Sequence, residues 1–242
     1  MYKIPFFIGT FVSWFIPGRN RRRRVRGNIN VFLFYIPIAR FIKRTYGKRA
    51  NTIKFVRQVS TNRMTCVVNN RYFVKIFRDV SVEQLNNYKF LLDFIRPRLS
   101  VNIPTIFVAK HIPMYVADKL PGKDLRDFDV REILKHEKKI KSAVIKMVDD
   151  MQSIGVRSIP ENHRFVRPLQ YDKSKPAQQI TTKSVLAHLD LNASNLLLDS
   201  NYNVISVIDW DSLSIVPSAN IDRDSFENLW AIYKRDHPVS KK

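Results

Sequence analysis

The segment at residues 184–217 constrains the fold more than any other part of this 242-residue chain. It contains two short apolar runs, 195–198 and 204–208, which are joined by the polar residues 199–203. Two apolar runs joined by a short polar turn are typical of a β-hairpin. A polar loop with Asp190 leads into the first run, and Asp209 follows the second. The hairpin is therefore predicted to bring Asp190, Asn195 and Asp209 together at one end.

These three side chains suit phosphate chemistry. Two carboxylates and a carboxamide supply the hard oxygen donors that Mg²⁺ prefers. Phosphoryl transfer needs a metal to gather phosphate charge and a carboxylate to orient the attacking hydroxyl. Taken singly, Asp190 could be a turn or cap residue, Asn195 a turn amide, and the nearby Asp211 a structural carboxylate. Their joint spacing favours a magnesium-dependent phosphotransfer site, with Asp211 in a structural role.

The letters HLDLNASN, followed by VIDWD, resemble the catalytic and metal-binding segments of the aminoglycoside phosphotransferase and choline kinase families, relatives of the protein kinase fold. Their pattern, H-x-D-x-x-x-x-N and later [IV]-D-W, is matched by His188, Asp190, Asn195, Asp209 and Trp210. The resemblance implies Asp190 as the catalytic base or hydroxyl-orienting residue, and Asn195 and Asp209 as Mg²⁺ ligands. His188 belongs to the same catalytic loop, where a structural role is favoured over proton transfer. Leu189 stands where these families usually have a small residue.

Two segments nearer the N-terminus resemble the nucleotide-binding lobe of these families. VSTNRMTCVV resembles the nucleotide loop of choline-kinase-like proteins, which implies ATP-phosphate contacts from Ser60, Thr61 and Asn62, although the glycines common there are missing. YFVKIF resembles the V-x-K strand, which implies that Lys75 pairs with the phosphates. Glu83, on the following helix, is then the expected partner of Lys75.

The segment MYVADKLPGKDL resembles the hinge between the two lobes of these proteins. The resemblance implies that the segment from Val116 through Asp118 to Leu120 offers backbone groups to adenine. It covers residues 52–236 and leaves residues 1–49 outside.

Apolar periodicity predicts an α+β fold. The expected strands are 52–59, 64–69, 71–77, 103–107, 114–117, 184–187, 195–198 and 204–208. The expected helices are 82–96, 129–154 and 222–236. This order fits a two-lobed protein-kinase-like fold, with a small antiparallel β N-lobe, a mostly helical C-lobe and a basic amphipathic N-terminal arm. We expect the arm over 1–49, the nucleotide-binding lobe over 50–119, and the catalytic and acceptor-binding lobe over 120–242.

The positive charge of the chain is concentrated at its N-terminus. The sequence has 42 Lys and Arg against 21 Asp and Glu, a net charge of +21. Residues 1–78 hold 18 of these cations and no acid, whereas residues 79–242 are nearly neutral. This excess indicates a polyanionic partner, but a nucleic-acid enzyme would more often have cations around its cleft. The single cysteine, Cys66, excludes a disulfide scaffold and a multi-cysteine zinc site.

The first 49 residues combine apolar blocks with arginine runs. The blocks 4–17 and 31–42 are shorter than the roughly 20 residues that span a bilayer, and a secretory signal would have its positive charge ahead of the apolar core. Aromatic residues beside arginines suit a segment lying among lipid headgroups. The alternatives are a helical arm packed on the domain and a nucleic-acid-binding arm. The expected contacts to an anionic membrane are Phe6, Phe7, Phe11, Trp14, Phe15, Arg21, Arg22, Arg23 and Arg24.

Together these features predict a kinase that transfers the γ-phosphate of ATP to a hydroxyl with Mg²⁺. Its acceptor should be anionic or membrane-bound, because a chain with a net charge of +21 and an interfacial arm suits such an acceptor. A cationic acceptor is less favoured, since Phe226, Trp230 and Tyr233 fit a core stripe better than an aromatic cage. SWFIPGRNRRRRVR resembles a basic segment of bacterial lipopolysaccharide and surface-polysaccharide enzymes, which implies a sugar acceptor on such a precursor. The enzyme would then be cytoplasmic and peripheral on the inner membrane face. The alternatives are a choline/ethanolamine-type or other small-molecule kinase, and a membrane-tethered pseudokinase that serves as a binding module.

Overall fold

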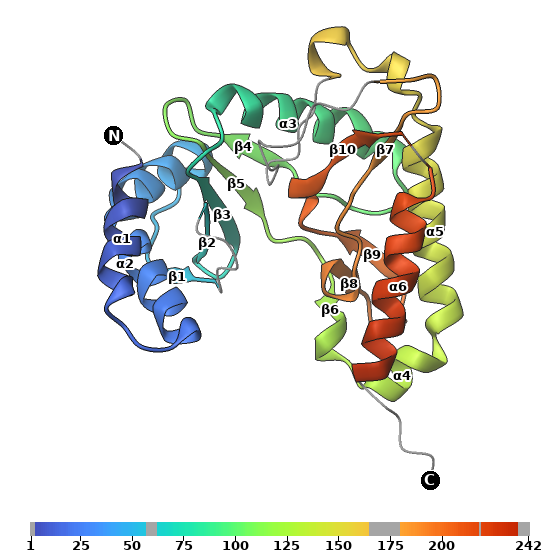
Figure 1. Ribbon diagram of the computed structural model, residues 1–242, viewed down its shortest axis with the longest axis horizontal. Coiled ribbons are helices and arrows are strands. Elements are labelled where there is room, and N and C mark those ends of the chain that lie inside the picture. Colours follow the sequence, from blue (N-terminus) through green and yellow to red (C-terminus); the bar gives the residue numbers. More distant parts are fainter. Residues whose placement is uncertain (1–2, 57–61, 165–179, 218, 237–242) are drawn as a thin grey trace. The chain divides into compact units, whose positions relative to one another are not determined.

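The computed structural model of the protein describes residues 3–56, 62–164, 180–217 and 219–236 (Figure 1). The chain forms two compact units. The first consists of Met1–Lys89 and Thr105–Lys119, and the second of Phe90–Pro104 and Leu120–Lys242. The helix α3 (Val82–Ile95) contains the first crossing between them, and the last crossing lies between Lys119 and Leu120.

The first unit is built on a five-stranded antiparallel sheet in the order β1-β2-β3-β5-β4. Its strands are β1 (Ile53–Phe55), β2 (Arg63–Val68), β3 (Tyr72–Phe77), β4 (Ile106–Val108) and β5 (Met114–Asp118). Alternate side chains of β2 are buried, so one face of the strand belongs to the core. Asn69 and Asn70, both with φ of 54°, form the turn between β2 and β3. Asn tolerates this left-handed conformation, which suits a tight hairpin turn. The strands expected over 64–69 and 71–77 are confirmed, and the described part of 52–59 contains β1, whereas 57–59 lie outside the described residues.

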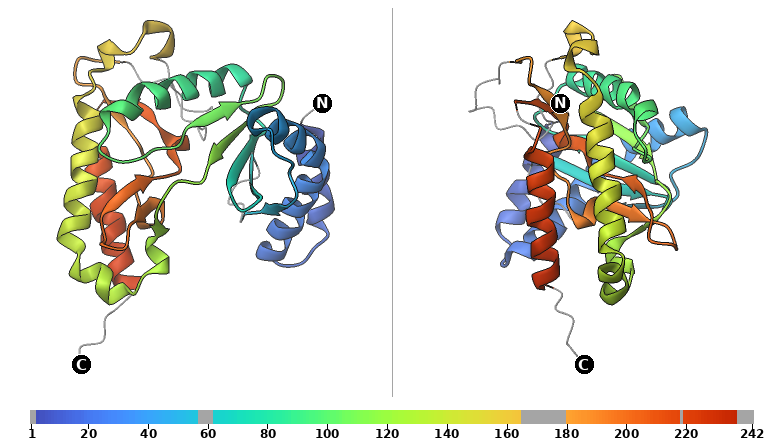
Figure 2. Two further views of the ribbon diagram at one scale, coloured as in Figure 1. Left: turned by 180° about the vertical axis from the view of Figure 1, so that it is seen from behind. Right: turned by 90° about the vertical axis from the view of Figure 1, so that its right-hand side faces the viewer.

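The N-terminal arm is a pair of helices, α1 (Ile4–Trp14) and α2 (Arg19–Tyr46), and α2 lies between α1 and the strands (Figures 1 and 2). One face of α2 is fully buried in the core of the sheet through Phe34, Ile38 and Ile42. Phe6 is only 1% exposed, and its ring lies 5.6 Å from that of Phe34. The prediction that Phe6 meets a membrane is therefore wrong, because this side chain fills the contact between the two helices.

Neither helix of the arm is suited to crossing a bilayer. Within the described ranges, no helix combines the length and the apolar character that a membrane span requires. The helix α1 is apolar but has 11 residues, and the 28-residue α2 contains the arginine run.

The second unit is α+β, with short strands beside longer helices. Its helices are α4 (Val130–Lys135), α5 (Glu137–Ser153) and α6 (Ile221–Asp236). β6 (Lys123–Asp124), β8 (Leu196–Leu198) and β9 (Val204–Val207) form one sheet, and β7 (Val185–Ala187) pairs with β10 (Ser214–Val216). The chain also has 3₁₀ turns at Arg96–Arg98, Leu125–Asp127, Val156–Ser158, Glu161–His163, Ala193–Asn195 and Trp210–Ser212.

The helix expected over 129–154 is divided into α4 and α5. His136, with φ of −98° and ψ of 11°, ends the first and begins the second. Its ring lies 4.2 Å from that of Tyr202, a contact from a distant part of the chain. The helices α5 and α6 lie side by side (Figure 1). Phe226 and Trp230 of α6 are each 1% exposed, so they are core residues, as the stripe predicted.

Candidate active site

The hairpin that carries the candidate site is present. β8 and β9 are antiparallel, and Leu196 lies opposite Val207. The carboxylate of Asp199 holds the turn, because it accepts the backbone N–H groups of Asn201 at 2.8 Å and Asn203 at 2.9 Å. The pKa of Asp199 is lowered most by a hydrogen bond from the Asn203 side chain, and the two backbone hydrogen bonds lower it further. The polar turn thus fixes which ends of the two strands meet.

The loop before β8 holds the carboxylate of Asp190 in a fixed orientation. Asn192 Nδ2 donates to Asp190 Oδ1 at 3.0 Å, and Asn195 Nδ2 donates to Asp190 Oδ2 at 3.2 Å. Asn195 Nδ2 also donates to the backbone carbonyl of Asp190 at 2.8 Å. An ionised carboxylate only accepts hydrogen bonds, and its two oxygens offer about four lone-pair sites. The geometry therefore suits a base that orients an incoming O–H.

Backbone and ring contacts join this loop to Asp209. Ile208 donates its N–H to the carbonyl of Asn195 at 2.9 Å, which places the next residue, Asp209, at the same end of the hairpin. His188 is fully buried, and its Nε2 lies 3.2 Å from the carbonyl oxygen of Ile208. The His188 ring packs edge-on against Trp210 with a centroid separation of 4.5 Å. His188 thus connects the loop to the hairpin.

A buried carboxylate that the sequence interpretation missed supports this loop. Asp222, at the start of α6, accepts the backbone N–H groups of His188 at 2.7 Å and Leu189 at 2.8 Å. Burial raises the pKa of Asp222, against the opposite effect of these two bonds. Leu189 has a φ of 62°, a left-handed conformation that is uncommon for a bulky residue. This backbone conformation explains why a small residue is usual at the position after the histidine and why Leu189 is unusual there. The sequence does contain a signal for this buried carboxylate. Asp222 is a charged residue four positions before Phe226, so it lies on the apolar stripe of the same helix.

The donor set at this end of the hairpin fits Mg²⁺ held together with nucleotide phosphates. Asn195 turns its amide nitrogen toward Asp190, which directs its oxygen away from that residue. Asp209 has a φ of 57° and a ψ of 54°, a strained conformation of the kind that is concentrated at functional sites. Within the described ranges there is no metal-binding group of three or more His, Cys, Asp or Glu side chains. Mg²⁺ typically uses one or two carboxylates plus substrate phosphates, so Asn195 and Asp209 would be the protein ligands if the metal binds here together with a nucleotide.

The candidate phosphate-binding lysine lies on the central strand of the first unit. Lys75 is half-buried on β3, opposite Thr65 on one side and Tyr115 on the other. Its Nζ lies 5.9 Å from the centroid of the Tyr115 ring. Glu83 is exposed in the first turn of α3, and no cation within the described ranges pairs with it. The structure therefore does not contain the expected Lys75–Glu83 ion pair.

Of the three predicted contacts from the nucleotide loop, the structure describes one, Asn62. Ser60 and Thr61 lie outside the described residues. Asn62 is exposed, and its carbonyl accepts the N–H of Arg78 at 2.8 Å, closing the end of the sheet.

The predicted adenine contact at Val116 is corrected by the sheet. Val116 is fully buried and lies opposite Val74 and Phe107, so β5 has a neighbouring strand on each side. An interior strand uses its backbone groups in the ladder, which leaves none at Val116 for a base. Asp118 ends β5 and accepts the Tyr46 hydroxyl at 3.1 Å. Leu120 follows β5 and lies outside the sheet.

Several solved phosphotransferases have the same fold. APH(2")-IIia in complex with GDP and kanamycin matches with a TM-score of 0.59 and 13% identity, over 86% of this chain and 84% of that chain. The ADP-bound aminoglycoside phosphotransferase APH(2'')-Ib gives a TM-score of 0.53 and 14% identity, over 78% and 73%. APH(2")-IIa with streptomycin and ATP matches with a TM-score of 0.52 and 14% identity, over 77% of this chain and 73% of that chain. No protein-family model and no curated protein matches the sequence. The chain therefore has the kinase-like α+β fold of the aminoglycoside phosphotransferases.

Proposed function

We propose that this protein is a phosphotransferase that moves the γ-phosphate of ATP to a hydroxyl group with Mg²⁺. The observation that carries the proposal is the hydrogen-bonded group of Asp190, Asn192 and Asn195, joined to Asp209 through the Ile208 backbone. This group combines an oriented carboxylate with hard oxygen donors. These are the groups that a protein supplies in phosphoryl transfer, since catalysis there depends on positioning and charge stabilisation. The likeness to structures with bound ATP, ADP and GDP supports a nucleotide donor.

Each residue has a separate part in this proposal. Asp190 accepts a hydrogen bond from the acceptor hydroxyl and aims its oxygen at the phosphate. Asn195 and Asp209 hold Mg²⁺, which when bound neutralises charge on the phosphate oxygens. Lys75 pairs with phosphate oxygens, and its place on a central strand limits its movement. His188 and Asp222 position the loop and do not touch the substrate.

The favoured acceptor is a sugar of a lipopolysaccharide or surface-polysaccharide precursor at the inner face of the cytoplasmic membrane. The positive charge of the N-terminal third supports an anionic or membrane-bound acceptor. Phe226 and Trp230 are buried, so these two side chains do not form an aromatic cage for a choline-like cation. The likeness to structures with kanamycin and streptomycin favours a second candidate, a kinase for a small soluble acceptor.

One transfer experiment separates these possibilities. The full chain is incubated with γ-labelled Mg-ATP and, in parallel, with purified lipopolysaccharide, kanamycin or choline. We expect label on a sugar of the lipopolysaccharide, a mass increase of one phosphate group on that sugar, and neither signal with Asp190→Asn. Label on kanamycin or choline alone would contradict the glycan acceptor. Binding of Mg-ATP without transfer to any acceptor or to water would identify a pseudokinase.

A further inference from the structure

The helix α1 exposes an apolar surface that is unusual for a helix packed on a folded domain. It contains no charged residue, and its described contacts are predominantly with α2. Phe7 is 66% exposed and Phe11 63%, while Trp14 and the following Phe15 are each 75% exposed. α2 adds Phe32, at 79% exposure. We define these five aromatic residues as the aromatic face.

The aromatic face belongs to an ordered part of the protein. α2 is anchored by Phe34 and Ile38, which are buried in the core of the sheet, and α1 is anchored on α2 by Phe6. Gly27 of α2 permits the close approach of the Phe55 ring, since a Cβ at this position would overlap that ring. The two helices therefore present their outer side chains from a fixed support, and within the described residues no segment covers them.

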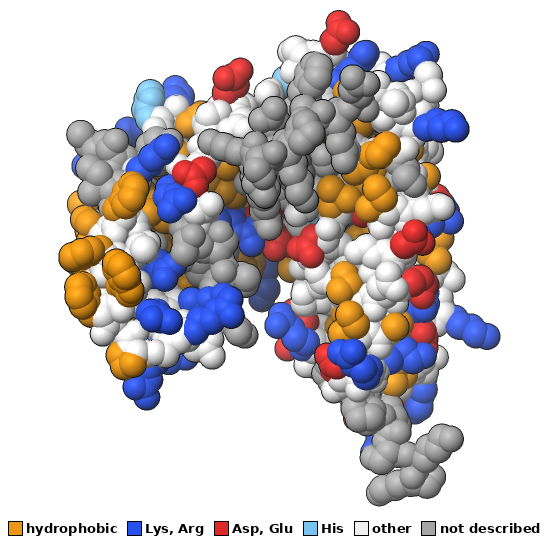
Figure 3. Space-filling model, viewed as in Figure 1, with side chains coloured by type: hydrophobic (Ala, Val, Ile, Leu, Met, Phe, Trp, Pro, Cys, Tyr) orange, Lys and Arg blue, Asp and Glu red, His pale blue; other side chains and the backbone are white. Residues whose placement is uncertain are grey.

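Six arginines lie in the first turns of α2, directly after the aromatic residues of α1 in sequence. Arg19, Arg21 and Arg24 are exposed, and Arg22, Arg23 and Arg26 are half-buried. None of the six pairs with a carboxylate of the described residues, and the first acidic residue in the chain is Asp79. Burial lowers the pKa of Arg26, and the charges of Arg22 and Arg23 lower it further. Figure 3 shows hydrophobic side chains gathered over α1 and α2, with Lys and Arg side chains next to them.

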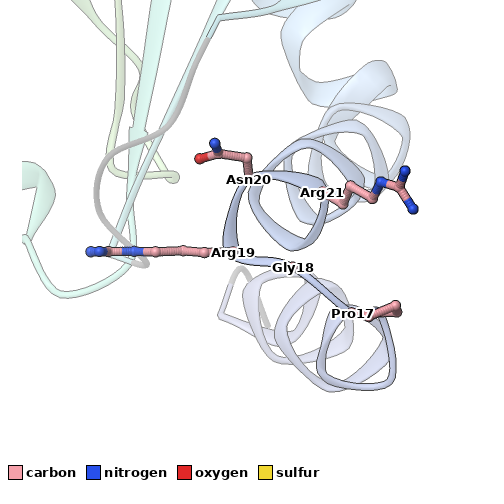
Figure 4. Close-up of a pocket in the computed structure, with 5 residues that line it drawn as sticks. All are labelled: Pro17, Gly18, Arg19, Asn20 and Arg21. Atoms are coloured by element: carbon pink, nitrogen blue, oxygen red, sulfur yellow. The ribbon is translucent and has the colours of Figure 1, made fainter.

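The arrangement of these arginines favours an extended anionic surface over one small anion. A pocket of about 410 Å³ lies at the turn between the helices, lined by Pro17, Gly18, Arg19, Asn20 and Arg21. Figure 4 shows that the side chains of Arg19 and Arg21 point in opposite directions, so they do not converge on a ligand in this pocket. Arg21 and Arg24 are three residues apart on α2 and share one side of the helix, so they can meet separate phosphates of one lipid surface.

We infer that the aromatic face and its arginines form a docking surface for an anionic lipid bilayer. Aromatic side chains enter the headgroup and acyl boundary, while the arginines meet lipid phosphates. A second copy of the chain is a poorer occupant, because it would bring a second unpaired arginine cluster against the first. The inference does not depend on the phosphotransferase proposal, since it uses only residues of α1, α2 and the turn between them.

The first test is co-sedimentation of the full chain with vesicles of phosphatidylcholine, alone or mixed with phosphatidylglycerol. The variant Arg19→Gln/Arg21→Gln/Arg24→Gln removes three exposed cations. Each cation near the surface contributes about fivefold in affinity, and Arg19 points away from Arg21, so two of the three face one lipid surface and we expect a loss of about 25-fold on the anionic vesicles. The matched control, Lys110→Gln/Arg131→Gln/Lys138→Gln, removes the same charge from exposed positions elsewhere and should bind like the wild type.

Tryptophan fluorescence gives a second readout of the same surface. Trp210 and Trp230 are each 1% exposed, whereas Trp14 is 75% exposed, so an emission shift on vesicle addition reports Trp14. We expect a blue shift with anionic vesicles. The variant Trp14→Phe should keep the binding and lose the shift, and Trp14→Ala should bind about tenfold more weakly. The control Ile232→Ala, at a 42% exposed position on α6, should change neither property.

Several results would overturn the inference. Equal binding of the arginine triple variant and its control would show that this cluster does not meet lipid. Failure of the full chain to sediment with anionic vesicles, together with dimer formation in analytical ultracentrifugation, would assign the surface to a second copy. Tighter binding to a nucleic acid duplex than to vesicles would assign it to nucleic acid. A failure here leaves the transfer experiment unaffected, because soluble acceptors and water report turnover without a membrane.

Discussion

Replacing Asp222 by Asn should separate support of the catalytic loop from nucleotide binding. The carboxylate accepts two backbone N–H groups, from His188 and Leu189, and an amide can accept only one while its own N–H₂ opposes the other. A hydrogen bond to a charged group contributes about 1.5–3 kcal/mol. The substitution also removes a buried charge whose desolvation raises the pKa of Asp222, which offsets part of the loss. We therefore expect a net destabilisation of about 2 kcal/mol, with a Tm lower by about 4–8 °C.

The assay compares thermal unfolding and steady-state turnover of Asp222→Asn with those of Asp224→Asn. Asp224 lies in the same first turn of α6 but is exposed, so this control also loses a negative charge near the helix N-terminus. A displaced Asp190 should lower kcat by about 100-fold and leave the KM for ATP nearly unchanged. If the two variants have the same Tm and the same kcat, Asp222 does not support the loop and the reasoning is refuted.

Three further substitutions test other parts of the fold. Gly27→Val should lower the stability of the first unit by about 1–3 kcal/mol in denaturant unfolding, because its side chain would overlap the Phe55 ring; unchanged stability would contradict the packing of α2 on β1. Tyr46→Phe should cost about 1 kcal/mol, because it removes the hydroxyl that donates to Asp118; an unchanged denaturation midpoint would show that this bond contributes nothing. Hydrogen bonds lower the pKa of Asp199 below 3.8, so its contribution to stability is present above that pH and lost as pH falls through the lowered pKa. The stability difference between wild type and Asp199→Asn should therefore shrink in acid, and a constant difference would contradict the assignment.

Local patterns predicted much of the fold. The alternation in β2 and β3, and the apolar runs on either side of residues 199–203, gave the correct strands because burial on one face of a strand repeats every second residue. A hairpin also joins the start of its first strand to the end of its second, and Asn195 accordingly accepts the N–H of Ile208, the residue before Asp209. These are contacts between neighbouring segments, and their geometry follows from short stretches of sequence.

Contacts between distant segments were not predictable in the same way. Asp222 reaches the catalytic loop from more than 30 residues away, and the break at His136 accompanies a contact with Tyr202. The helix α1 is apolar on every side, so periodicity could not distinguish the buried Phe6 from the exposed Phe7. In each case the outcome depends on which surface another element covers.

The most direct measurement of the central claim is γ-phosphate transfer from Mg-ATP by wild type, Asp190→Asn and Asp209→Asn, with nucleotide binding measured on the same samples. In the proposed mechanism Asp190 orients the acceptor, so Asp190→Asn should keep the Mg-ATP-dependent rise in Tm and lose about 10²–10⁴-fold in turnover. In the same proposal Asp209 holds the metal, so Asp209→Asn should lose turnover and most of that rise in Tm. Wild-type turnover by Asp190→Asn, or an unchanged Mg-ATP effect in Asp209→Asn, would contradict the proposed site.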